Sequence, residues 1–85
     1  MEVTEVRSKI KEIISTVSSI PVEDIADNAS YQDDLALDSL TLLEIGVDVD
    51  YEFKLGLPEE RLQHIQSVQD AVDIVMQSLS ERKVA

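Results

Sequence analysis

The sequence predicts an all-α fold, a four-helix bundle with three longer helices, one short helix and a long first loop. Apolar residues recur at spacings of three and four over three separate stretches, which is the period of an amphipathic helix. Alternating polar and apolar residues nowhere continue long enough for a β-strand. A chain of 85 residues can bury one modest core. We therefore expect a single domain over residues 1–85, with an ordered core at about residues 3–80.

The first predicted helix spans residues 2–18 and leads into a long connection. Its apolar stripe comprises Val3, Val6, Ile10, Ile13, Ile14 and Val17. Pro21 ends this helix at or before Ile20, because the residue before a proline disfavours helical geometry. Residues 20–37 then form a loop longer than most in compact domains, with one turn opening at Pro21. We expect five loop residues to anchor in the core: Val22, Ile25, Ala29, Tyr31 and Leu35.

The second predicted helix spans residues 39–53 and is apolar over more than half of its circumference at its start. Asp38 is a good N-cap, which puts Ser39 in the first turn. Two apolar stripes follow and point in different directions. One comprises Leu42, Ile45, Val49 and Phe53, and the other comprises Leu40, Leu43 and Val47. One stripe has to face the core, so the other is surplus to a four-helix bundle or faces a partner or a cargo.

The rest of the chain predicts a short helix and a longer last one. Gly56 suits a turn, and Pro58 opens the short segment PEERL. Ser67 caps the last helix, with Asp70 three positions on as in a capping box. The buried face of that helix comprises Val68, Ala71, Val72, Val75, Met76 and Leu79.

The negative charge is concentrated in the middle of the chain. Residues 21–60 hold twelve acids and one lysine, and so carry the whole net charge of −11. Such a surface repels nucleic acid and anionic lipid and attracts a basic protein surface. Acids that only keep a small protein soluble are the alternative explanation. No stretch resembles a signal peptide or a membrane span, and there is no cysteine, so we expect a cytoplasmic protein without disulfides.

Ser39 is the residue whose position calls for a chemical explanation. The only histidine, His64, has nothing to place it beside Ser39, so a catalytic pair is not expected. A calcium loop over residues 48–59 fails because Phe53 stands where glycine is needed, and we expect no metal site. A phosphate on a first-turn hydroxyl would meet free backbone N–H groups and the positive end of the helix dipole. Ser39 is thus a phosphodiester acceptor or simply a helix cap, and local physics leaves both open.

The order of short motifs along the chain is the most specific signal in the sequence. Asp38-Ser39-Leu40, preceded by Asp34-Leu35, heads an acidic helix that ends in Tyr51-Glu52-Phe53. A proline-led segment, Leu57-Pro58-Glu59-Glu60, and a last helix opened by Ser67-Val68 follow. D-S-L alone is a weak signal, but this set in this order resembles the acyl carrier protein family over nearly the whole chain.

The resemblance implies a carrier without enzymatic activity of its own. Ser39, flanked by Asp38 and Leu40, would bear 4′-phosphopantetheine transferred from coenzyme A by a phosphopantetheinyl transferase. The thiol of this arm would carry acyl groups as thioesters between acyl-loading, condensing and acyl-transfer enzymes with basic docking surfaces. By the same analogy the protein would be a monomer, and the stripe that begins at Leu42 would be core. The partner surface would comprise Leu40, Leu43 and Val47, rimmed by Glu44, Asp48 and Asp50.

The motif departs from that of carriers in primary fatty-acid synthesis, which commonly read L-G-x-D-S-L-D. Ala36 stands for the glycine, and Thr41 stands where an acid is usual. Gly46 lies in mid-helix, at a cost of about 1 kcal/mol against alanine, and suggests a bend or an opening for cargo. The departures leave the fatty-acid pathway open and favour specialised polyketide or lipid chemistry. The alternatives are a peptidyl or aminoacyl carrier, against which the acidity argues, and an unmodified acidic helical adaptor.

Overall fold

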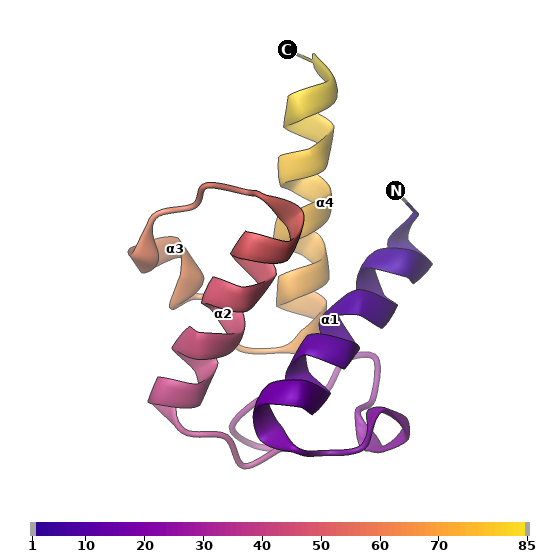
Figure 1. Cartoon of the computed structure of the whole chain (residues 1–85), viewed down its shortest axis with the longest axis vertical. Helices are drawn as coiled ribbons and strands as arrows, with labels where there is room; N and C mark the ends of the chain where they lie inside the picture. Colours follow the sequence, from indigo (N-terminus) through magenta and orange to yellow (C-terminus); the bar gives the residue numbers. More distant parts are fainter. Residues whose placement is uncertain (1, 85) are drawn as a thin grey trace.

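The predicted all-α bundle is confirmed by a computed structural model, which describes the backbone of residues 2–84 and, except at residues 59 and 81–84, their side chains (Figure 1). Its elements are α1 (Val3–Ser18), a 3₁₀ turn η1 (Val22–Asp24), α2 (Ser39–Phe53), α3 (Glu59–Leu62) and α4 (Val68–Val84). Between residues 2 and 84, β structure is limited to one isolated bridge between Ser30 and Ser67. The backbone of α4 stays helical to Val84, so an ordered core that ends near residue 80 remains a prediction.

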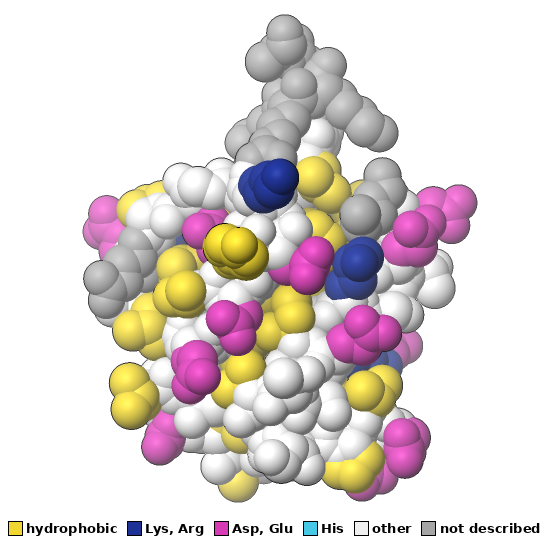
Figure 2. Space-filling view, in the orientation of Figure 1, with side chains coloured by type: hydrophobic (Ala, Val, Ile, Leu, Met, Phe, Trp, Pro, Cys, Tyr) yellow, Lys and Arg dark blue, Asp and Glu magenta, His cyan; other side chains and the backbone are white. Residues whose placement is uncertain are grey.

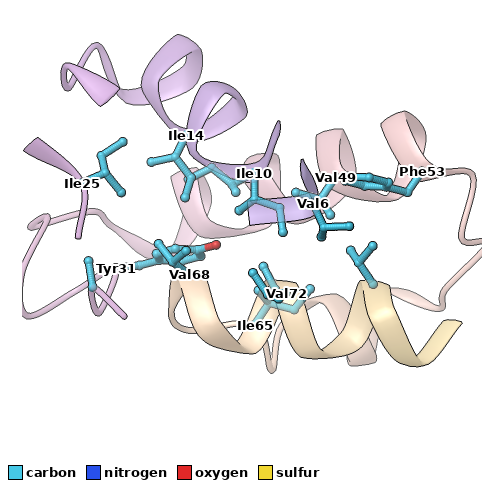
Figure 3. Close-up of a cluster of buried hydrophobic side chains, with 14 of the residues drawn as sticks. Val6, Ile10, Ile14, Ile25, Tyr31, Val49, Phe53, Ile65, Val68 and Val72 are labelled. Atoms are coloured by element: carbon cyan, nitrogen blue, oxygen red, sulfur yellow. The ribbon is translucent and has the colours of Figure 1, made fainter. Parts of the chain in front are cut away.

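The core lies between α1, α2 and α4, with α1 running opposite to the other two (Figure 1). The predicted core stripe of α2 is confirmed: Ile45, Val49 and Phe53 are buried, and Leu42 is half-buried against them. On α4 the predicted face is also found, with Met76 and Leu79 half-buried at its far end. Figure 3 shows side chains from these helices meeting in one cluster. The fully buried members from α1 and α4 are Val6, Ile10, Ile14, Val68, Ala71, Val72 and Val75.

The long first loop is anchored by three side chains that are at most 2% exposed: Ile25, Ala29 and Tyr31. Leu35 is half-buried against the same core. Val22 is 39% exposed, so the expectation that it anchors the loop is wrong. The reason is local: Val22 begins the 3₁₀ turn η1, and the turn delivers Ile25, at its far end, to the core instead.

Backbone hydrogen bonds hold the second half of this loop against the connection between α3 and α4. The Tyr31 N–H donates to the Gln66 carbonyl at 2.9 Å, and the Tyr31 carbonyl accepts from the Leu37 N–H at 2.9 Å. The Val68 N–H donates to the Ala29 carbonyl at 3.0 Å. These bonds fix the backbone at and near Tyr31, whose side chain is buried, so the chain reaches the start of α2 from a fixed position.

Gly46 allows α3 to lie close to α2. It is buried, and a Cβ built on it would lie 3.3 Å from the Leu62 Cβ and 3.5 Å from the Leu62 carbonyl oxygen. A side chain there would therefore push Leu62 outward. This close approach gives the mid-helix glycine a packing reason that its position in the sequence does not reveal.

Ala36 adopts a left-handed backbone conformation, with φ of 54°. The resemblance to carrier proteins places it where glycine is common, and this conformation costs an L-residue about 1–2 kcal/mol. We expect Ala36→Gly to raise the free energy of unfolding by about 0.5–1 kcal/mol, after allowance for the larger entropy of glycine in the unfolded chain. Ala26→Gly, at an exposed alanine without positive φ, should lower it. Urea titration measures the free energy of unfolding of both variants. An Ala36→Gly variant less stable than the wild type would contradict the inference that the Ala36 backbone is strained.

Candidate functional site

Ser39 is the first residue of α2, and its side chain is exposed. Asp38 caps the helix as predicted: its carboxylate accepts from the Thr41 N–H at 2.8 Å, and its carbonyl accepts from the Leu42 N–H at 3.0 Å. Among the described residues the Ser39 hydroxyl has no hydrogen-bond partner. Because Asp38 provides the cap, the serine is not needed for it, and its hydroxyl is free to react.

The carboxylate of Asp38 is held in its charged form by the helix it caps. The Thr41 backbone N–H, followed by the Thr41 side chain, holds the pKa of Asp38 below its usual range. The contribution of this cap to stability is therefore present above the ordinary aspartate pKa, and it is lost as the pH falls through the lowered value of the folded protein. At neutral pH the cap is fully formed beside Ser39.

His64, the only histidine in the sequence, does not lie in the same groove as Ser39. Its exposed side chain lines a depression with Arg61, Asp70 and Asp73, whereas Ser39 opens onto a different groove. Over residues 2–84, excluding the side chains that are not described, no cluster of histidines and acids could hold a metal ion. The chemistry that the geometry offers at Ser39 is that of an accessible hydroxyl at a helix start.

The second apolar stripe of α2 projects from the outer face of the helix. Leu40 is 75% exposed and Val47 is 48% exposed, while Leu43 is half-buried. Glu44 and Asp48 are exposed beside them. Figure 2 shows acidic and hydrophobic side chains interleaved over α2. Leu40 and Val47 of this stripe thus face solvent beside acidic side chains, whereas Leu43 packs partly against the core.

Tyr51 extends this surface and was missed by the sequence analysis. It is 84% exposed, the highest value among the large exposed hydrophobic side chains. Its position four residues after Val47 was the available signal, because side chains at that spacing share a helix face. We call the resulting surface the docking face. It comprises Leu40, Leu43, Glu44, Val47, Asp48 and Tyr51.

Asp50, which is predicted to belong to the partner surface, also makes a structural contact. Its side chain is half-buried, and its Oδ1 accepts from the Leu57 N–H at 3.0 Å. Its backbone carbonyl accepts from the N–H groups of Lys54 and Leu55 at the end of α2. These bonds hold the loop before α3, and the part of Asp50 in partner binding stays a prediction.

Few of the described acidic side chains between residues 21 and 60 have a cationic partner. The one ion pair among the described side chains joins Lys11 to Asp27, where the hydrogen bond and charge of Lys11 lower the pKa of Asp27. We expect the unpaired acids to repel one another, so the Tm should rise between about 10 mM and about 0.5 M salt. Each 1 kcal/mol of repulsion removed corresponds to about 5 °C. A Tm that does not change with salt would show that the acids are too far apart for their repulsion to affect stability.

None of the helices over residues 2–84 combines the length and the apolar character that a membrane span requires.

Comparisons with known proteins agree with this geometry. Residues 8–75 match the family described as phosphopantetheine attachment site. The acyl carrier protein of Buchnera aphidicola subsp. Schizaphis graminum is 39% identical over 70 residues, which cover 82% of this chain and 89% of the relative. The acyl carrier protein of Chloroherpeton thalassium is 32% identical over 77 residues, which cover 91% of this chain and 96% of the relative.

A solved structure agrees as well. The apo doublet acyl carrier protein from prodigiosin biosynthesis superposes with a TM-score of 0.79 at 26% identity. The match covers 91% of this chain and 38% of the doublet. The chain therefore belongs to the acyl carrier protein family, whose covalently attached prosthetic group is 4′-phosphopantetheine.

Proposed function

We propose that Ser39 is the residue to which the 4′-phosphopantetheine arm is attached. The observation that carries this proposal is the exposed Ser39 hydroxyl at the first position of α2, left free because Asp38 caps the helix. A phosphodiester there lies beside backbone N–H groups that have no partner within the helix and near the positive end of its dipole. The arm supplies the thiol that the chain lacks, since the sequence contains no cysteine.

The function that follows is transport of acyl groups as thioesters between enzymes, in the cytoplasm and as a monomer. Ala36 and Thr41 depart from the housekeeping motif, and one solved relative comes from prodigiosin biosynthesis. Both observations favour specialised polyketide or lipid synthesis over primary fatty-acid synthesis.

We assign the contact with partner enzymes to the docking face. Glu44 and Asp48 are exposed, and they attract a basic surface and orient it as it approaches. Leu40 and Val47 then offer apolar area at the centre of the contact. The partners that fit are the phosphopantetheinyl transferase and acyl-loading, condensing and acyl-transfer enzymes with cationic docking surfaces.

Intact-mass measurement tests the attachment site. The wild type, Ser39→Ala and Ser8→Ala are each incubated with coenzyme A and a broad-specificity phosphopantetheinyl transferase. We expect the wild type and Ser8→Ala, which changes an exposed serine of α1, to gain one phosphopantetheine, and Ser39→Ala to gain none. Circular dichroism establishes that all three are folded. A gain on Ser39→Ala, or none on the folded wild type with several transferases, would refute the proposal.

A further inference from the structure

An open groove of about 320 Å³ lies between α1 and α2, which are side by side in the bundle (Figure 1). Glu12 and Ile13 of α1 form part of one wall, and Asp48, Tyr51 and Glu52 of α2 form part of the other. Ligand pockets range from about 300 to 1,000 Å³, so this groove suits one long side chain better than a whole ligand. Because Asp48 and Tyr51 belong to the docking face, the groove continues that face onto α1.

Tyr51 contributes nothing to the core of the bundle. Its side chain is 84% exposed and makes no hydrogen bond to another described residue. The same turns of α2 are anchored by Val49 and Phe53, which are buried. An aromatic ring offers an interface a large rigid area and a π face that attracts cations. The ring of Tyr51 is therefore available to a binding partner.

The charges of the groove favour a cation as its occupant. The carboxylates of Glu12, Asp48 and Glu52 are exposed, and none has an ion pair or a hydrogen bond with another described side chain. Lys9, on the same wall as Glu12, makes no ion pair with any of them. Three carboxylates against one ammonium group leave two negative charges in excess among the described side chains. Such a groove repels the phosphates of nucleic acid and of anionic lipid.

The kind of cation follows from the arrangement of these groups. No group of three acids or histidines among the described side chains could hold a metal ion. An arginine guanidinium is planar, stacks on an aromatic face and donates several N–H groups to carboxylates, whereas the lysine ammonium is compact and strongly hydrated. The groove combines the exposed ring of Tyr51 with carboxylates on both walls, so it fits arginine better than lysine.

We propose that this groove receives an arginine side chain of the phosphopantetheinyl transferase, and that Glu12 thereby makes α1 part of the surface that the transferase recognises. The inference rests on the proposed attachment at Ser39 and on the docking face. Tyr51 follows Ser39 by twelve residues, which is about 18 Å along α2. A standard interface covers about 800 Å² of each partner, a patch roughly 28 Å across, so an enzyme that acts on Ser39 can reach the groove as well.

Loading kinetics test the contribution of α1. At low salt we expect Glu12→Gln to lower kcat/KM for the carrier about two- to five-fold, as loss of one exposed ion pair implies. The matched control is Glu23→Gln, which removes an exposed carboxylate from η1, outside the groove, and should load like the wild type. Circular dichroism establishes that both variants are folded. A folded Glu12→Gln variant that loads as fast as Glu23→Gln would overturn the proposal.

Double-mutant cycles identify the occupant of the groove. Each exposed arginine of the transferase is replaced by alanine in turn, and each variant enzyme is assayed with wild-type, Glu12→Gln and Tyr51→Leu carriers. Tyr51→Leu keeps an apolar side chain and removes the π face. For one arginine we expect the effects of both carrier variants to disappear, since the partner of both groups is already lost. Additive effects for every arginine would refute an arginine in the groove.

The outcomes separate the groove from the proposed function. A wild type that gains no arm would refute attachment at Ser39, and this inference with it. If the wild type is loaded and Glu12→Gln has no effect, while reversal of Glu44 and Asp48 slows loading, the docking face stands and the groove is refuted.

Discussion

Replacing Tyr31 by alanine should lower the free energy of unfolding by about 3–5 kcal/mol. Its side chain is fully buried in the core cluster (Figure 3), and the backbone bonds on either side of it hold the loop that leads to Ser39. A domain of 85 residues has a total free energy of unfolding of about 4–13 kcal/mol, so the loss is a large fraction of it. Urea titration measures the change, and a loss below about 1 kcal/mol would contradict the anchoring role.

Tyr31→Phe is the matched control, because it keeps the ring and removes only the hydroxyl. That hydroxyl is buried and has no hydrogen-bond partner among the described residues. We expect Tyr31→Phe to stay within about 1 kcal/mol of the wild type at neutral pH. If it is as destabilising as Tyr31→Ala, the stabilisation comes from the hydroxyl and not from packing.

The wild type and Tyr31→Phe should differ in stability at high pH. Burial, followed by the charge of Asp70, raises the pKa of Tyr31 well above its usual range. The neutral hydroxyl is thus favoured by folding, so stability is lost as the pH rises from the ordinary tyrosine pKa toward the raised value of the folded protein. Tyr31→Phe should lose less stability over that range than the wild type.

Reversing Glu44 and Asp48 to lysine together should slow loading by the transferase by about 10- to 100-fold at low salt. Both side chains are exposed on the docking face, and neither contributes to the core or to the cap of α2. The rate is measured as arm addition against time, and the melting temperature shows whether the variant is folded. The difference from the wild type should shrink as salt screens the charges.

The control for this experiment reverses two acids elsewhere, Glu5 of α1 and Asp24 of the 3₁₀ turn η1, both exposed. It makes the same change in net charge away from the docking face. We expect its loading rate to stay close to that of the wild type. If the two double variants slow loading equally, overall charge steers the transferase and the docking face has no special part.

The helices and the cap could be predicted because their signals are local. Apolar spacing identified the two stripes of α2, and the family resemblance indicated which of them is core. An aspartate directly before an apolar run identified the cap. The loop carries no such periodicity, so the sequence predicted the burial of Ile25 correctly but could not show that Val22 stays exposed.

The features of the site that the sequence did not predict depend on contacts between segments that are distant in the sequence. The Asp50 side chain accepts a hydrogen bond from a backbone N–H seven residues away, and an acidic residue on a helix does not predict such a contact. Gln32, Gln63 and Gln66 line the groove beside Ser39, and they come from the first loop and from the connection between α3 and α4. Their spacing in the sequence has no period from which a groove could be inferred.

Fragmentation of the loaded wild-type protein in a mass spectrometer tests the central claim, attachment at Ser39, most directly. The account predicts that the added phosphopantetheine appears in every fragment that contains Ser39. Fragments that end at Asp38 or begin at Leu40 should have the mass of the unmodified chain. An added mass located on any other serine would contradict the account.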